Sequence, residues 1–337
     1  KLDRGDFIAP FNVNGIAISA VISLKKITSS GKNVIAYLKT GKKRAKSVIV
    51  IGAHGDHLGY GFTSSSRATA DEKDLIHHGA DDNASGVASI MELAQYFTHL
   101  KISDLLKDSK RDIIFVIWSG EELGALGSTY FINKYEEEKA NNKSVQNIDA
   151  YINIDMIGRL KDKLVIQGVG SSSDWPCEIE KANAITKLSL SVQSDPYIPS
   201  DGTQFYLNKI PILHFFTGSH EDYHTPKDTA LKINLVGERE ITKLIESILY
   251  SLVTSDNEIE YREVKDHSQM DRSSHSGLNV YIGTIPDYSK EDINGVLLTG
   301  VKKDSTAEKS GLKKDDIVIK ISGKTILNIY EYKLSLK

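Results

Sequence analysis

Between residue 33 and about residue 252, short apolar runs alternate with longer segments whose apolar residues recur at helical spacing. The short runs are NVIAYL, SVIVIGAH, DIIFVIWS, AYINIDMIG and IPILHFF, and helical spacing marks ASGVASIMELAQYF, GALGSTYFINKY and NLVGEREITKLIESILYSLV. Strands that are apolar on both faces and alternate with helices predict an α/β fold, with helices on both faces of a mainly parallel central sheet. Ligands of such sheets bind beyond the carboxyl ends of the strands.

The pattern changes after about residue 254, where the chain becomes polar and charged as far as residue 277. Short β-type runs follow (NVYIG, GVLLTGV and DIVIKISG), together with one short helical stretch, STAEKSG. A polar stretch between two different patterns is typical of a domain boundary. We therefore predict a large α/β domain over residues 1–255, a linker over 256–276 and a small β-rich domain over 277–337.

Composition narrows the kinds of partner and site. The chain has 337 residues, 40% of them hydrophobic, with a net charge of -3. This balance argues against binding to nucleic acid or to an anionic membrane, and no apolar run reaches the ~20 residues that a spanning helix needs. Cys177 is the single cysteine, which excludes an internal disulfide and a cysteine-rich zinc site. Any metal must therefore be held by His, Asp and Glu. The start at Lys1, without a methionine or a signal-type segment, suggests a processed chain.

Residues able to bind metal or transfer protons recur where the predicted strands end. SVIVIGAH leads into His54 and Asp56, whose spacing of two points both side chains the same way in an extended chain. One could bind a metal while the other orients it, or the two could simply satisfy each other in a loop. DIIFVIWS leads into Glu121 and Glu122, two adjacent carboxylates that repel each other and are costly to bury.

A third cluster precedes a predicted amphipathic helix. Asp81, Asp82 and Asn83 stand there, and one such residue is explained by helix capping. Two acids and an amide make a second role about equally plausible. The helix is expected to bury the face that carries Val87, Ile90, Met91, Ala94 and Phe97.

Two further segments bring acids and imidazoles to a strand end. Asp155 has apolar neighbours and needs a cation or several donors, while GSHEDYHTP gathers His220, Glu221, Asp222 and His224 in one loop. Carboxylates that converge with imidazoles from five separate segments would repel one another unless divalent cations neutralised them. The pattern therefore favours a two-metal site. Mixed His and carboxylate ligands suit zinc best, with manganese or cobalt as alternatives.

The ordered motifs H-x-D, G-A-D-D-N-x-S-G, G-E-E-x-G-x-x-G-S, N-x-D-M-x-G and Y-H-T-P-x-D, over residues 33 to about 250, resemble the di-zinc aminopeptidases of peptidase family M28. The resemblance implies a role for each matching residue, and it implies two Zn²⁺ ions per chain. The implied ligands of one ion are His54 and Asp155, those of the other are Glu122 and His224, and Asp81 would bridge both. Glu121 matches the general base, and Asp56 matches the carboxylate that hydrogen-bonds a liganding imidazole.

The resemblance also implies a tyrosine that stabilises the oxyanion, three residues before an S-D-H motif. Tyr197, three residues before Ser200, is the candidate, and Gly202 replaces the histidine that the family usually has. The other histidines, His57, His77, His78 and His220, match no family role and are expected in loops or on the surface. Asp82 and Asn83 are expected to act in the loop and at the helix start, and Cys177 to be structural.

Residues 280–326 resemble a PDZ domain through the loop Ile282-Gly283-Thr284 and the signature STAEKSGLKKDDIVIKISG. PDZ domains bind a peptide's C-terminus as an added strand. The chain stops at Lys337, early in the expected groove-lining helix, so the module is interpreted as truncated. Members of this family that carry such a module suggest an exported bacterial enzyme, in the periplasm, on the cell surface or secreted.

The sequence thus predicts a zinc aminopeptidase that hydrolyses the first peptide bond of peptides with a free N-terminus. In the implied mechanism, two metals activate a water molecule and Glu121 transfers its proton. Two other functions remain open: a glutaminyl cyclase-like enzyme on the same scaffold, and a non-catalytic protein that binds peptides through the PDZ-like module.

Overall fold

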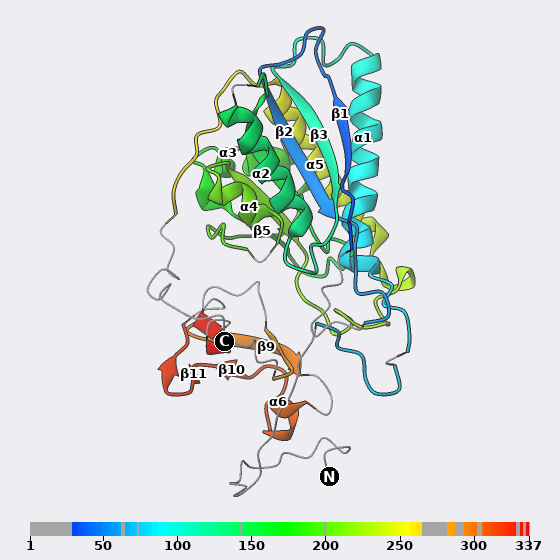
Figure 1. Ribbon diagram of the computed structural model, residues 1–337, viewed down its shortest axis with the longest axis vertical. Coiled ribbons are helices and arrows are strands. Elements are labelled where there is room, and N and C mark those ends of the chain that lie inside the picture. The colour runs from blue at the N-terminus through cyan, green and yellow to red at the C-terminus, as the bar shows by residue number, and fades with distance from the viewer. Residues whose placement is uncertain are drawn as a thin grey trace, which may run out of the picture. The chain divides into compact units, whose positions relative to one another are not determined.

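The computed structural model (Figure 1) describes residues 29–61, 65–72, 74–141, 143–198, 200–264, 282–286, 293–301, 305–327, 331–332 and 335–336. The chain divides into two compact units, Lys1–Ser30 and Gly31–Lys337. All helices and strands given below belong to the second unit.

A seven-stranded sheet forms the centre of the large α/β region, in the order β1-β3-β2-β4-β7-β5-β6. The four strands β3, β2, β4 and β7 run parallel to one another, while β1 is antiparallel to β3, and β5 is antiparallel to β7 and parallel to β6. The prediction of a mainly parallel central sheet is therefore confirmed. The strands are β1 (Val34–Leu38), β2 (Ser47–His54), β3 (Arg111–Trp118), β4 (Asn147–Ile154), β5 (Leu164–Gln167), β6 (Leu190–Val192) and β7 (Ile212–Phe216).

Helices cover both faces of this sheet, as the sequence predicted (Figure 1). Alternate residues of β2 enter different cores, because side chains of a strand alternate between the two faces: Ile49 and Ile51 pack with α1, α3 and α5, whereas Val48 and Val50 pack with α2 and α4. The helices are α1 (Gly86–Ile102), α2 (Leu126–Ala140), α3 (Trp175–Thr186), α4 (Gly202–Leu207) and α5 (Leu235–Thr254), with short turns η2 (Ala80–Ser85), η3 (Val169–Ser171) and η4 (Ala230–Lys232).

The buried face of α1 differs from the predicted one at one position. Met91 is 64% exposed, and Leu93, only 1% exposed, takes its place in the core beside Ile90 and Phe97. Residues 90, 93 and 97 follow the i, i+3, i+7 spacing of a narrow helical stripe, and position 91 lies on the flank of that stripe. The prediction for Met91 was therefore wrong.

Three polar side chains near the carboxyl ends of the strands, those of Trp118, Tyr151 and Asn153, form a buried hydrogen-bonded chain. The Trp118 indole donates to the Tyr151 hydroxyl at 2.8 Å, and this hydroxyl donates to the Asn153 Oδ1 atom at 2.6 Å. Gly52 leaves the space for that pair, because a Cβ atom there would lie 2.4 Å from the indole nitrogen. The ring of Phe205 stacks on Tyr151 with centroids 3.8 Å apart. This chain of hydrogen bonds links β3 to β4 close to the strand ends that carry the predicted site.

The C-terminal region contains a three-stranded sheet in the order β10-β9-β8 and a two-stranded β11-β12 hairpin. One short helix, α6, occupies the predicted position in STAEKSG. Ile282, in the predicted peptide-binding loop, accepts a backbone hydrogen bond from Ala307. Peptide binding by this region stays a prediction. The elements are β8 (Thr284–Pro286), β9 (Val296–Val301), α6 (Thr306–Lys309), β10 (Ile317–Val318), β11 (Lys320–Ile321) and β12 (Lys324–Thr325).

The first part of the predicted linker lies against the large α/β region. The Arg262 amide donates to the Ser171 carbonyl at 2.7 Å, and the Val264 amide donates to the Tyr206 hydroxyl at 2.7 Å. The rest of that segment, residues 265–276, and the chain end at Lys337 lie outside the described residues.

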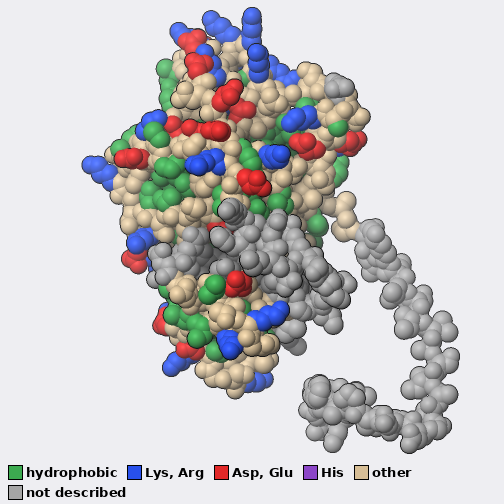
Figure 2. All heavy atoms as spheres, turned by 90° about the vertical axis from the view of Figure 1, so that its left-hand side faces the viewer, with side chains coloured by type: hydrophobic (Ala, Val, Ile, Leu, Met, Phe, Trp, Pro, Cys, Tyr) green, Lys and Arg blue, Asp and Glu red, His purple; other side chains and the backbone are tan. Residues whose placement is uncertain are grey.

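Basic and acidic side chains are interspersed on the face drawn in Figure 2. Among the helices that the structure describes, none combines the length and the apolarity needed to cross a bilayer.

Candidate metal centre

The parallel strands deliver the candidate residues to one edge of the sheet. His54 is the last residue of β2, Glu121 and Glu122 follow β3, and Asp155 directly follows β4. His224 belongs to the loop after β7. Because the carboxyl ends of parallel strands meet at the same sheet edge, residues far apart in sequence become neighbours there.

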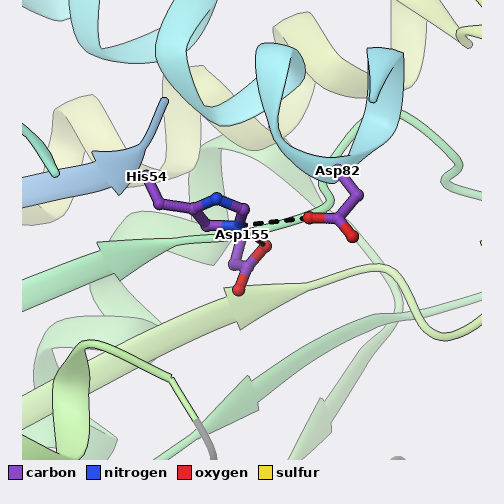
Figure 3. Close-up of side chains that lie close together, drawn as sticks. All are labelled: His54, Asp82 and Asp155. Carbon is purple, nitrogen blue, oxygen red and sulfur yellow. Dashed lines mark hydrogen bonds and ion pairs between the residues drawn. The ribbon is translucent and has the colours of Figure 1, made fainter. Parts of the chain in front are cut away.

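Three of these side chains form a first group (Figure 3). The His54 Nε2 atom lies 3.1 Å from Asp82 Oδ1 and 3.3 Å from Asp155 Oδ1. His54 comes from the end of β2, Asp82 from the turn before α1 and Asp155 from the end of β4, and the three polar ends point toward one another. Their ligand atoms all lie within 4.8 Å of one another, as a shared cation would require.

A second group uses the other oxygen of the same aspartate. The His224 Nε2 atom lies 3.2 Å from Asp82 Oδ2 and 3.2 Å from Glu122 Oε2. His57 joins this group, with Nδ1 2.8 Å from Glu122 Oε1. The Asp82 carboxylate therefore stands between two clusters and offers one oxygen to each.

Asp81, the predicted bridging residue, points away from both clusters. Its carboxylate accepts hydrogen bonds from the Gly158 amide at 2.6 Å and the Ser85 hydroxyl at 3.2 Å, and it pairs with His220 Nε2 at 3.1 Å. Asp81 is fully buried, and these donors satisfy it. Asp82, the next residue, takes the position between the two groups that was predicted for Asp81, because Asp82 and Asn83 leave helical φ/ψ angles within η2.

Asp228 holds the η2 turn in this orientation. Its Oδ2 atom accepts the backbone N–H groups of Asp81 at 2.8 Å and Asp82 at 3.1 Å, while its Oδ1 atom accepts from Arg159 at 3.1 Å. Asp228 was visible in the sequence as the last residue of Y-H-T-P-x-D, but its role there was not. A fully buried carboxylate with three donors is a fixed anchor for the turn.

Asp56 acts on the turn that carries the two glutamates. Its carboxylate oxygens accept the amides of Glu121 at 3.1 Å and Glu122 at 3.3 Å. The His54 Nδ1 atom lies 3.0 Å from the backbone carbonyl of Asp56 and 4.0 Å from its carboxylate. The imidazole is thus oriented mainly by the main chain of Asp56, and the side chain positions the glutamates.

A hydrogen-bonded chain supports Asp155 from below. The Asn153 amide donates to Ser200 Oγ at 2.8 Å, and this hydroxyl donates to Asp155 Oδ2 at 3.3 Å.

The ring of Tyr197, the predicted oxyanion residue, packs edge-on against Tyr206, and the role assigned to it stays a prediction. The remaining histidines lie outside the helices and strands, as expected, but they differ in exposure: His77 and His220 are buried, His57 is half-buried and His78 is exposed.

The histidines and the carboxylates of the site have pKa values shifted in opposite directions. Burial alone would lower the pKa values of His54 and His224, but the neighbouring carboxylates raise the pKa of His54 well above 6.5 and that of His224 to about 10. Burial would raise the pKa values of Asp82 and Glu122, but their hydrogen bonds with the histidines lower both. The site thus demands positive charge, which protons on the imidazoles supply in the absence of metal.

Glu121 differs from Asp82 and Glu122, the acids that pair with histidines, in the direction of its pKa shift. Burial raises the pKa of Glu121 well above its usual value, and the carboxylates of Asp155, Asp201 and Asp82 add to the shift against the opposing effect of His54. Asp201 is itself buried, accepts a hydrogen bond from Ser128 at 2.5 Å and has a pKa raised to about 7, chiefly by burial. A carboxyl group with such a raised pKa is suited to accept and return a proton near neutral pH.

The donor set fits two divalent ions such as zinc. Bonds of 2.0–2.2 Å to nitrogen and oxygen place the ligand atoms of a tetrahedral site about 3.3–3.6 Å apart. The separations between the imidazole nitrogens and carboxylate oxygens of the first group, 3.1 and 3.3 Å, lie at or just below that range, as do both His224 separations of 3.2 Å. Carboxylates packed this closely without metal are held only by protonated imidazoles, so metal binding would relieve the requirement for those protons.

A family model, described as peptidase family M28, matches residues 33–249. The chain belongs to this family. The match covers the whole seven-stranded sheet and every member of the two groups.

Curated relatives of this M28 member include aminopeptidases. It is 27% identical over 208 residues to leucine aminopeptidase 2 of Trichophyton rubrum, covering 59% of this chain and 36% of that protein. It is 24% identical over 246 residues to aminopeptidase YwaD of Bacillus subtilis, covering 69% of this chain and 48% of that protein. The chain therefore spans between about a third and half of the length of these relatives.

Solved structures show the same fold. The zinc aminopeptidase BSAP from Bacillus subtilis superposes with a TM-score of 0.51 at 21% identity, covering 68% of this chain and 52% of that one. The aminopeptidase LapA from Legionella pneumophila gives a TM-score of 0.51 at 21% identity, covering 67% and 59%. These likenesses confirm the α/β architecture of this M28 protein.

Proposed function

We propose that this M28 protein is a metal-dependent aminopeptidase that removes the N-terminal residue of peptides through a two-ion centre. The observation that carries the proposal is the Asp82 carboxylate, which offers one oxygen to the His54–Asp155 group and the other to the His224–Glu122 group. The aminopeptidase names of the curated relatives support the reaction class.

The chain's own residues divide the chemistry between holding ions and moving a proton. His54, Asp82 and Asp155 would hold one ion, and Asp82, Glu122 and His224 the other. When bound, two such ions lower the pKa of a water molecule and polarise the carbonyl of the scissile bond. Glu121, with its raised pKa, would take the proton of the attacking water and deliver it to the departing amine nitrogen.

Two further carboxylates, those of Asp56 and Asp228, hold the main chain of the proposed ligands and base in position. Asp56 holds the amides of Glu121 and Glu122 together, so Glu121 would stay beside the ion that Glu122 would bind. Asp228 holds the amide of Asp82, so the shared carboxylate keeps its position between the two groups. Tyr197 as oxyanion donor, a C-terminal peptide as ligand of the PDZ-like module, and export from the cell remain parts of the hypothesis.

Hydrolysis of aminoacyl-nitroanilides by zinc-loaded protein tests the proposal. Glu121→Gln should lower kcat by roughly 10² to 10⁴ because proton transfer is lost, while two ions per chain remain by metal analysis. Glu180→Gln, an exposed change on α3, is the matched control and should keep wild-type activity. Full activity in Glu121→Gln would refute the role of the base. Pyroglutamate formation from peptides with N-terminal glutamine, without release of amino acids, would favour the glutaminyl cyclase alternative.

A further inference from the structure

His57 joins the second group, that of Asp82, Glu122 and His224, although the sequence motifs assign it no role. Its Nδ1 atom is 2.8 Å from Glu122 Oε1 and 3.8 Å from Asp82 Oδ2. Its side chain is only 9% exposed. The nitrogen therefore faces the same two carboxylates as His224.

The surrounding backbone fixes the orientation of the His57 ring. Gly79 has a φ angle of 61°, and a Cβ atom there would lie 2.7 Å from the Cγ atom of His57. The ring thus packs directly against the glycine backbone. On another side, the His224 ring meets it edge-on, with centroids 5.7 Å apart. Its Nε2 atom is buried and has no hydrogen-bond partner among the described residues, so Nδ1 is the nitrogen turned toward the carboxylates.

We infer that His57 is an additional metal ligand, binding through Nδ1 the ion that Asp82, Glu122 and His224 hold. The inference rests on the proposed two-ion centre and refines it. His57, Asp82 and Glu122 offer ligand atoms that all lie within 4.8 Å of one another. The two imidazoles contact different oxygens of Glu122: His57 Nδ1 lies 2.8 Å from Oε1, and His224 Nε2 lies 3.2 Å from Oε2. Asp82 Oδ2 lies 3.8 Å from His57 Nδ1 and 3.2 Å from His224 Nε2.

This ligand makes the two ion sites unequal. With His57 the second site would have four protein ligands, whereas the site of His54, Asp82 and Asp155 would have three. Zinc sites with three protein ligands keep a position for water or substrate, and a site with four would have to expand to five-coordination to take one. The ion beside His57 should therefore be held more tightly, and a chelator should first remove the ion beside His54.

Cadmium NMR can count the histidine ligands directly. Protein with ¹⁵N-labelled histidine is loaded with two equivalents of ¹¹³Cd²⁺, and ¹¹³Cd–¹⁵N couplings are recorded. We expect couplings to three imidazoles, those of His54, His57 and His224, with the His57 coupling at Nδ1. His57→Asn should leave two couplings, and the exposed His78→Asn, the matched control, should leave three.

Chelator competition gives a second readout. His57→Asn should weaken the tighter ion by more than the roughly 10- to 100-fold that loss of a residue hydrogen-bonded to a ligand costs, and His78→Asn should weaken neither ion. Two bound Cd²⁺ ions with couplings to only two imidazoles in the wild type would overturn the inference and leave the two-ion centre intact. Failure of the wild type to bind Cd²⁺ would overturn both. The wild-type coupling count decides the question even if a variant does not fold.

Discussion

Two pairs of adjacent acids, Asp81–Asp82 and Glu121–Glu122, lie at the same edge of the sheet. In each pair the two carboxylates have different surroundings, and the difference is not the same in the two pairs. In the Asp81–Asp82 pair, the first residue is fully buried and satisfied by Gly158, Ser85 and His220, and the second enters the site. In the Glu121–Glu122 pair, Glu122 pairs with histidines, whereas Glu121 is buried near His54 and three carboxylates, those of Asp155, Asp201 and Asp82. Neighbouring acids thus acquire an anchoring, a ligating or a proton-transferring role from the groups that surround each carboxylate.

The strongest test of this comparison changes each member of the aspartate pair. Asp82→Ala should abolish binding of both ions and reduce peptidase activity to background, because both groups share this carboxylate. Asp81→Ala should retain both ions and activity within about tenfold, but lower the free energy of unfolding by roughly 3 kcal/mol because buried donors lose their acceptor. Metal analysis and urea unfolding measure the two effects. Loss of metal in Asp81→Ala with metal retained in Asp82→Ala would restore the assignment made from the sequence.

The two anchoring carboxylates, Asp56 and Asp228, provide the next test. Each holds the main chain of one acid pair, so Asp56→Asn and Asp228→Asn should each weaken ion binding by about 10- to 100-fold without removing a ligand. Chelator competition measures the loss. The exposed Asp162→Asn is the control and should bind both ions as the wild type does. Unchanged ion affinity in both anchor variants would mean that the turns keep their shape without these carboxylates.

The smallest effects concern the opposite pKa shifts within the glutamate pair in metal-free protein. The pKa of Glu122 is lowered, so its ionised form stabilises the fold above about pH 4.5, and this contribution is lost as the pH falls. The pKa of Glu121 is raised, so stability declines as the pH rises from about 4.5 through its folded-state pKa.

The two glutamine variants should therefore diverge as the pH rises. Relative to wild type, Glu122→Gln should lose stability and Glu121→Gln should gain it, each with a slope of at most about 1.4 kcal/mol per pH unit. Urea unfolding between pH 2 and 8 in the presence of chelator measures both slopes: that of Glu122 lies below about pH 4.5, and that of Glu121 lies above it. Parallel slopes for the two variants would show that the pKa values of Glu121 and Glu122 are not shifted in opposite directions.

Sequence patterns predicted the large elements well and the smaller ones poorly. The long apolar runs that became β2, β3, β4 and β7 were identified, because strands buried on both faces are apolar throughout. Residues 164–207 were not resolved into elements, yet they contain β5, α3, β6 and α4. β6 has only three residues and α4 only six, too few for a period to be recognised.

The candidate site shows the same division at the level of single residues. His54, Glu122, Asp155 and His224 were named from motifs, and the structure brings them together. The choice between Asp81 and Asp82 depends on two φ/ψ pairs inside η2, which residue types alone do not reveal. His57 carried no signal beyond its position next to H-x-D, and its place beside Glu122 depends on the packing of Gly79.

The sequence by itself determined the α/β class, the membership of the M28 family and the segments that supply acids and imidazoles, because these depend on local patterns of apolar and ligating residue types. Only the tertiary structure decided which carboxylate is shared by the two clusters, which aspartates fix the turns, and which histidines are buried. Those outcomes depend on side-chain directions at strand ends and on hydrogen bonds between segments up to 159 residues apart. Such contacts exist only after the sheet has aligned its carboxyl ends.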